Sequence, residues 1–392
     1  MADIRSLSSD DLFHVEGMST RVGRALRRVR PFVFALVGLS MLASQSAAIP
    51  PAADGPRLAA TRTAIADHPA GYGIAEPGNT LPRTSVPDFQ GRWLEIRNQL
   101  VASGTCWLRS DMGTRLAAGL DANPWLGSQL PCSRSARPPI KVLAILDYFT
   151  IWQGPTLCPN VRFSDVYDPQ RTGDFALSDW TLLVRCVARR FAGRIAAYEI
   201  WNEPLLRPFQ YGYQDGSAGH YFEMLQIAHR EIKAADPRAL VIALGGSDLY
   251  ANRDHADRLV RAKAFTRDLV SLGAADYADA ISVHAYPWGT YGSTVWTSYR
   301  TELAFHAEAW GRPVWITETG HRANESGTQS EYLRGAYALF VEAGVERIFW
   351  FAMTDQKDGP FGIAGKPAQQ ALRAFIGAPK GAGTGSGSAR PR

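Results

Sequence analysis

The chain has 392 residues, of which 46% are hydrophobic and 20% charged, and its formal net charge is +5. This composition is ordinary for a soluble globular protein with one large domain or two smaller ones. The small positive excess, without a dense run of Lys or Arg beyond the N-terminal segment, argues against a nucleic-acid-binding protein.

The N-terminal segment, residues 1–48, has the order of a secretory signal. Basic residues between Arg21 and Arg30 precede an apolar run at 31–43, and small residues follow as far as Ala48. We expect cleavage after Ala47 or Ala48 and a secreted or periplasmic protein without stable membrane insertion. An uncleaved anchor is the alternative, although the apolar run is shorter than the roughly 20 residues that a span needs.

Four cysteines follow the signal: Cys106, Cys132, Cys158 and Cys186. No C-x-x-C pair occurs among them, which argues against a structural zinc site. Export favours two disulfides, and three pairings are possible. Because Cys132 and Cys158 both fall in predicted loops, we expect them to form one pair; four reduced, packed thiols are the alternative.

From residue 71 onwards, apolar runs with the character of buried strands alternate with runs of helical periodicity. In chain order the pattern predicts a strand at Tyr72–Glu76, a helix at Phe89–Ala102, a strand at Cys106–Asp111, a loop with short helical pieces at 112–139, a strand at Ile140–Tyr148, a helix at Leu177–Phe191, a strand at Ile195–Glu203, a helix at His220–Ala235, a strand at Ala239–Leu244, a helix at Arg258–Leu272, a strand at Ala280–Tyr286, a helix at Thr297–Trp310, a strand at Val314–Glu318, a helix at Glu331–Ala343, a strand at Arg347–Phe351 and a helix at Pro367–Ile376.

Eight strands alternating with helices predict an α/β protein with a single (β/α)₈ barrel at 71–376. An Ala- and Pro-rich lead-in at 49–70 would precede the barrel, and a disordered tail at 377–392 would follow it. A doubly wound open sheet is the rival architecture. The absence of G-x-G-x-x-G after the first strand weakens its dinucleotide-binding version.

Polar and aromatic side chains gather where the predicted strands end, which is the end at which barrel enzymes place their chemistry. Two buried strands each end in a glutamate, at Tyr198-Glu199-Ile200-Trp201-Asn202-Glu203-Pro204 and at Val314-Trp315-Ile316-Thr317-Glu318. Paired carboxyl groups at one end of a parallel sheet suit glycoside hydrolysis, in which one donates a proton and the other attacks the sugar.

These motifs resemble those of the clan A glycoside hydrolases, a group of retaining (β/α)₈ glycosidases. Trp201-Asn202-Glu203-Pro204 is similar to the Asn-Glu-Pro motif of the clan's fourth strand, His284-Ala285-Tyr286-Pro287 to the motif of its sixth strand, and Trp315–Gly320 to that of its seventh. The resemblance covers the whole barrel, and families 39 and 5 are the most similar within the clan.

The resemblance implies that Glu203 is the general acid/base and Glu318 the nucleophile of a double displacement. Glu203 must begin protonated, whereas Glu318 must be ionised. Glu199 is the rival acid on the fourth strand. It shares the strand face of Glu203 but lies about 13 Å deeper, so we expect a buried, paired group.

Further substrate-binding residues are expected at the same end of the barrel. They are Arg109, Asp147, Asn202, His284, Tyr286, Trp288 and Trp350. Arg109 and Tyr286 would hold Glu318 ionised, and Asn202 would bind a sugar hydroxyl. Trp288 and Trp350 offer flat faces for sugar C–H groups. Arg109 as a structural bridge, Asn202 as a turn contact, and His284 or Trp288 as core residues are the alternatives.

We therefore expect an exported retaining glycosidase that cleaves β-linked polysaccharides or oligosaccharides and needs no metal or other cofactor. The alternatives are a catalytically silent carbohydrate-binding barrel and an exo-acting enzyme similar to a β-xylosidase. A serine hydrolase is disfavoured because no G-x-S-x-G motif is present. Aromatic residues in the loops favour an extended cleft and endo action, and the oligomeric state is left open.

Overall fold

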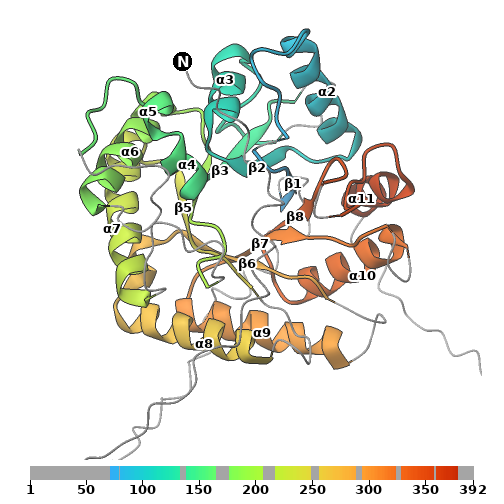
Figure 1. The fold of residues 1–392 in the computed structure, drawn as a ribbon. Coiled ribbons are helices and arrows are strands. Elements are labelled where there is room, and N and C mark those ends of the chain that lie inside the picture. The colour runs from blue at the N-terminus through green and yellow to red at the C-terminus, as the bar shows by residue number, and fades with distance from the viewer. Residues whose placement is uncertain are drawn as a thin grey trace, which may run out of the picture. The chain divides into compact units, whose positions relative to one another are not determined.

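Eight parallel strands close into a barrel in which every strand pairs with its neighbours in the sequence, and β1 pairs with β8 (Figure 1). The predicted (β/α)₈ fold is therefore confirmed. The strands are β1 (Tyr72–Ala75), β2 (Trp107–Asp111), β3 (Lys141–Leu146), β4 (Ala197–Ile200), β5 (Leu240–Asp248), β6 (Ala280–His284), β7 (Val314–Thr319) and β8 (Arg347–Phe351).

The computed structural model describes residues 71–78, 80–132, 138–164, 176–205, 217–248, 256–287, 294–323, 328–356 and 359–377. All of them lie within the unit Pro56–Arg392. The expected signal, the lead-in, nearly all of the tail and Trp288 lie outside the described residues. Within the part that is described, no helix is both long and apolar enough to cross a membrane.

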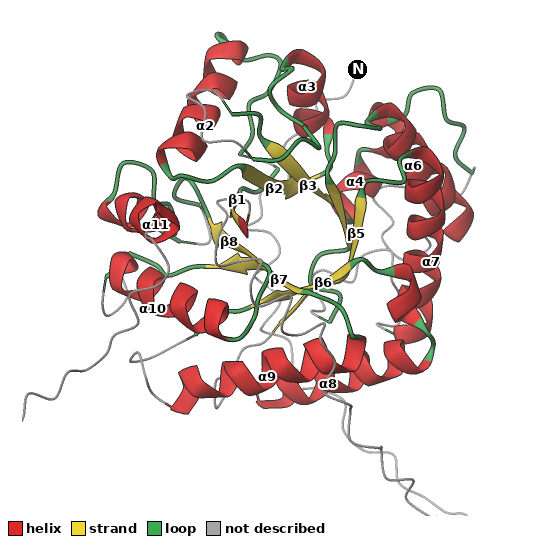
Figure 2. Cartoon of the chain, turned by 180° about the vertical axis from the view of Figure 1, so that it is seen from behind, coloured by secondary structure: helices red, strands yellow, loops and turns green. Residues whose placement is uncertain are grey.

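Helices surround the barrel, as the view from behind also shows (Figure 2). They are α2 (Phe89–Ala102), α3 (Thr114–Ala122), α4 (Tyr148–Trp152), α5 (Gly154–Leu157), α6 (Leu177–Arg190), α7 (Ala218–Ala235), α8 (Ala256–Ser271), the 3₁₀ helix η5 (Ala274–Tyr277), α9 (Thr294–Trp310), α10 (Gln329–Glu342) and α11 (Pro367–Gly377). Local chemistry sets several of their starts. Thr328 and Glu331, for example, form a capping box at α10.

Alternation along the strands divides the core into two layers. Inward-facing rings fill the lower part of the barrel: Trp107 packs against Trp315 and Phe349, with ring centroids 5.7 and 6.2 Å apart. The Arg347 guanidinium stacks on both tryptophans, 5.1 and 4.6 Å from their centroids. Trp350, the next residue after Phe349, belongs to the outer layer packed against the helices. The barrel floor is thus filled, which leaves the C-terminal strand ends for polar groups.

Both expected disulfides are present, but the expected pairing is wrong. Cys106 bonds Cys132, and Cys158 bonds Cys186. The first disulfide ties the residue before β2 to the loop after α3, and the second ties the segment after α5 to α6. A shared loop position does not identify disulfide partners here, because Cys132 and Cys158 each bond a cysteine at or next to a regular element.

Candidate active site

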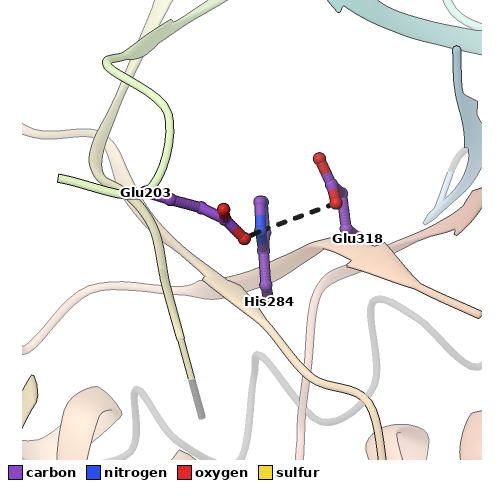
Figure 3. Close-up of side chains that lie close together, drawn as sticks. All are labelled: Glu203, His284 and Glu318. Atoms are coloured by element: carbon purple, nitrogen blue, oxygen red, sulfur yellow. Dashed lines mark hydrogen bonds and ion pairs between the residues drawn. The ribbon is translucent and has the colours of Figure 1, made fainter. Parts of the chain in front are cut away.

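Glu203, His284 and Glu318 come together at the C-terminal end of the barrel, with the histidine between the two glutamates (Figure 3). One carboxylate oxygen of each glutamate and one ring nitrogen of His284 lie within 4.8 Å of one another. The His284 side chain is fully buried, whereas those of Glu203 and Glu318 are 13% and 14% exposed. The two carboxyl groups therefore face one shared, partly solvated space.

An irregular backbone brings Glu203 to this place. The fourth strand ends at Ile200, not at Glu203 as expected, because Trp201 and Glu203 have left-handed φ values of 70° and 49°. Such conformations cannot continue a ladder and cost about 1–3 kcal/mol each. The Glu203 N–H donates to the carbonyl of Gly245 at 2.6 Å, so β5 holds the turn that presents this carboxyl group.

A bulge in β7 turns Glu318 inward. Val283 pairs with Ile316 and His284 with Glu318, so Thr317 is one extra residue opposite β6. Strict alternation from the inward-facing Trp315 would point Glu318 away from the barrel interior. With the extra residue, Thr317 and Glu318 both reach inside.

Arg109 links the groups around Glu318. Its Nε donates to Glu199 Oε2 at 2.6 Å, its Nη1 to Glu318 Oε1 at 2.5 Å and its Nη2 to Asn202 Oδ1 at 3.0 Å. Burial lowers the pKa of Arg109, but the charges of Glu199 and Glu318 raise it above its ordinary value. Its guanidinium is therefore a permanent cation between two carboxylates.

Glu199 is buried and paired, as the sequence suggested. Its Oε1 accepts from the Thr317 hydroxyl at 2.8 Å, and its Oε2 accepts from Arg109. The position of Glu199 on its strand predicts that it is buried, but it does not predict that Arg109 connects Glu199 with Glu318. Thr317 carried no signal in the sequence, because its contact depends on the bulge.

The protonation of His284 follows from its neighbours. Nδ1 lies 2.8 Å from Glu203 Oε1, and Nε2 lies 3.2 Å from Arg109 Nη2. Burial lowers the pKa of His284, while the charge of Glu318 and the hydrogen bond with Glu203 raise it above its ordinary value. A guanidinium can only donate, so Nε2 accepts from Arg109 in the neutral ring, whereas both ring nitrogens carry a proton in the imidazolium that the raised pKa favours. In both forms Nδ1 donates its proton to Glu203.

Glu318 is held in its ionised form. Burial raises the pKa of Glu318. The positive charges of His284 and Arg109, together with hydrogen bonds from Tyr286 and Arg109, outweigh burial and lower the pKa below its ordinary value. The Tyr286 hydroxyl donates to Glu318 Oε2 at 2.9 Å. Both oxygens of this carboxylate thus accept strong hydrogen bonds, the environment that a carboxylate nucleophile requires.

Asn202 and Asp147 lie in different surroundings. Asn202 is half-buried, and its side chain also hydrogen-bonds Tyr148. Asp147 is fully buried; its Oδ1 accepts from the N–H groups of Phe149 and Thr150 and so caps α4. The structure therefore brings Asn202 to Arg109, whereas Asp147 lies behind the surface of the site.

The structure does not place Trp350 where we expected it. This side chain is fully buried in the outer layer, and its indole N–H donates to the Phe361 carbonyl. The next residue, Phe351, faces inward and is half-buried. Phe361 packs against Phe351 and Tyr286, with ring centroids 5.5 and 6.2 Å apart. Parity along β8 was the available signal for preferring Phe351.

Glu203, His284 and Glu318 could each offer one ligand atom to a cation. The geometry favours acid–base chemistry instead. Glu318 is already paired with the Arg109 guanidinium, whose positive charge would oppose a divalent ion there. Paired carboxyl groups of this kind can protonate a leaving group and attack an electrophilic carbon.

Comparisons with known proteins agree with the barrel fold. Residues 263–363 match the family model described as glycosyl hydrolase catalytic core. This segment includes His284, Tyr286 and Glu318, whereas Arg109 and Glu203 precede it. No curated protein has significant sequence similarity to the chain.

Two solved structures illustrate the structural similarity. One is a β-glucosidase mutant derived from a hyperthermophilic tetrameric structure, with a TM-score of 0.52, 10% identity, and coverage of 78% of this chain and 94% of the other. The second is the endo-β-1,4-mannanase from Thermotoga petrophila, with a TM-score of 0.50, 13% identity, and coverage of 78% and 76%. The barrel fold of this chain is thus similar to the folds of these two glycoside hydrolases.

Proposed function

We propose that the protein is a retaining glycoside hydrolase that cleaves β-O-glycosidic bonds by double displacement, with Glu318 as nucleophile and Glu203 as general acid/base. One observation carries the proposal: carboxylate oxygens of Glu203 and Glu318 lie within 4.8 Å of each other. Retaining enzymes have carboxyl groups about 5–5.5 Å apart, whereas inverting enzymes leave about 6.5–9.5 Å for a water molecule.

The surroundings of the two carboxyl groups support their different roles. Glu318 accepts from Arg109 and Tyr286, and its pKa is lowered, so it is ionised and oriented for attack on the anomeric carbon. When Glu318 forms the glycosyl ester it loses its negative charge, so its hydrogen bonds with Arg109 and Tyr286 weaken. Arg109 remains ionised throughout, because Glu199 continues to pair with it.

Among the described residues, His284 is the hydrogen-bond partner of the Glu203 carboxyl group. His284 Nδ1–H donates to Oε1, which leaves Oε2 to carry the acid proton. In the first step Oε2–H protonates the leaving oxygen while Glu318 attacks. In the second step ionised Glu203 removes a proton from water, which attacks the anomeric carbon and releases Glu318. His284 keeps the same proton in both steps and orients Glu203.

The finer assignments rest on further support. The clan A-like fold and the neighbours named as a β-glucosidase and an endo-β-1,4-mannanase favour a β-linked carbohydrate substrate. Two disulfides favour an oxidising compartment and therefore export. Endo action on a polymer remains the preferred mode, from the aromatic loop residues of the sequence.

Hydrolysis of a panel of β-linked polysaccharides and aryl β-glycosides tests the proposal, with product anomers followed by NMR. We expect wild type to release the β-anomer first, and Glu318→Gln and Glu203→Gln to lose polysaccharide turnover. Asp121→Asn, which removes an exposed carboxylate on α3, is the matched control and should remain active. First release of the α-anomer would contradict the nucleophile assignment, and absence of turnover would favour the carbohydrate-binding alternative.

A further inference from the structure

Two carboxyl groups beside the proposed reaction centre take no part in the mechanism above. Asp111 ends β2 and Asp147 follows β3; they are 8% and 0% exposed. Their side chains are hydrogen-bonded to each other. Two ionised carboxylates can only accept hydrogen bonds, so this contact requires a proton on one of them.

The remaining contacts assign that proton. Burial raises the pKa of Asp111, while the Gly78 N–H, which donates to Oδ2 at 2.7 Å, and the charge of Arg109 favour its ionised form. Asp147 Oδ1 accepts from the N–H groups at the start of α4, but no N–H or O–H of the described residues reaches Asp147 Oδ2. Burial and the charge of Asp111 raise the pKa of Asp147 well above its ordinary value. Asp147 is therefore the donor and Asp111 the acceptor.

Asp111 lies at the same end of the barrel as the two glutamates. It is two residues beyond Arg109 on the inward-facing side of β2, hence about 6.6 Å nearer the mouth of the barrel. Arg109 contacts Glu318 directly. The negative charge of Glu318 also raises the pKa of Asp111, so the two carboxyl groups are near enough to interact. An ionised, slightly exposed acceptor there is suited to a sugar hydroxyl.

We propose that Asp111 is a specificity-determining residue that accepts a hydrogen bond from a hydroxyl group of the sugar bound against Glu318, and that Asp147 positions it by donating the proton shared between the two carboxyl groups. Gly78 takes part in the arrangement, because a Cβ there would lie 3.1 Å from Asp111 Oδ2. The recognition of a sugar by Asp111 rests on the proposed function, whereas the proton shared by Asp111 and Asp147 is independent of it.

The shared proton is tested by urea unfolding of wild type and Asp147→Asn between pH 5 and 8. The asparagine amide can cap α4 through its oxygen and donate to Asp111 through its nitrogen, so it imitates the protonated acid. In wild type the folded state holds one proton more than the unfolded state. Relative to the variant, the folding equilibrium constant of wild type should therefore fall about tenfold per pH unit until the pH reaches the raised pKa of Asp147. Parallel stability curves would overturn proton sharing.

The recognition role is tested on the 4-nitrophenyl β-D-glucoside, β-D-galactoside, β-D-mannoside and β-D-xyloside. Asp111→Asn should lower kcat/KM about 10- to 100-fold on the preferred sugar, mainly through KM, and should narrow the preference among the four. Asp121→Asn controls for the loss of one carboxylate. An equal loss on all four sugars, or no loss, would overturn the recognition role. If wild type hydrolyses none of the four glycosides, both the proposed function and the recognition role of Asp111 fail. The unfolding experiment still tests whether Asp111 and Asp147 share a proton.

Discussion

Replacing Arg109 by methionine should separate two tasks of this residue, stabilising the fold and supporting the nucleophile. The side chains of Arg109 and Glu199 are 3% and 0% exposed, and their Nε–Oε2 distance is 2.6 Å. Removing one partner of a buried ion pair leaves an uncompensated charge and costs about 3–5 kcal/mol. Glu318 loses a charge-assisted hydrogen bond worth about 1.5–3 kcal/mol, or roughly 10- to 150-fold in kcat/KM.

The double variant Arg109→Met/Glu199→Gln tests this reasoning. The glutamine amide that replaces the Glu199 carboxylate would still accept from the Thr317 hydroxyl while removing the buried charge, so most of the lost stability should return. Activity should not return, because Glu318 still lacks its guanidinium partner. Urea unfolding measures the stability and kcat/KM the activity. If the double variant is no more stable than Arg109→Met, the buried Glu199 charge is not the source of the loss, and the reasoning is refuted.

Three further changes have defined outcomes. Tyr286→Phe removes a hydrogen bond that lowers the pKa of Glu318, the proposed nucleophile, so the acidic limb of the kcat/KM profile should move to higher pH; an unmoved limb would contradict the bond. Gly246→Ala should reduce kcat/KM far more than Gly344→Ala, because both glycines have φ above 70° but only a Cβ at Gly246 would collide with the His284 ring. Cys106→Ser opens a disulfide with a sequence separation of 26 and should lower the unfolding free energy by about 3.5 kcal/mol, a difference that should vanish in reductant.

The barrel could be predicted because each of its strands and helices has a recognisable local sequence pattern. Apolar runs and helical periodicity alternate from Tyr72 onwards, and most element boundaries agree with the structure within a few residues. The two glutamates could be found because each ends an apolar strand motif. These features depend on nearest neighbours in the chain, which a sequence displays directly.

The backbone irregularities of the site could not be predicted in this way. The bulge at Thr317 lies in the pairing of β7 with β6, and the left-handed residues Trp201 and Glu203 follow β4 beside Gly245 of β5. Without the bulge, alternation along β7 would turn Glu318 outward. No residue type in these segments marks the irregularity, although Gly245 and Gly246 in the facing strand are consistent with a local break.

Two other expectations failed for separable reasons. Trp350 lies near a strand end, but a strand presents alternate residues to opposite faces, and the inward face of β8 carries Phe349 and Phe351. The pairing of Cys132 with Cys158 assumed that loop position identifies partners. Disulfide geometry depends on Cα separations in the folded chain, which are about 6 Å for both observed pairs.

The most direct test of the account is to trap the proposed covalent intermediate. A 2,4-dinitrophenyl 2-deoxy-2-fluoro-β-glycoside of the preferred sugar, followed by proteolysis and mass spectrometry, would identify the labelled residue. The account predicts one fluoroglycosyl group on the peptide that contains Glu318, and no label in Glu318→Gln. A label on Glu203, or turnover of the parent glycoside to the inverted anomer, would contradict the assignment of Glu318 as nucleophile.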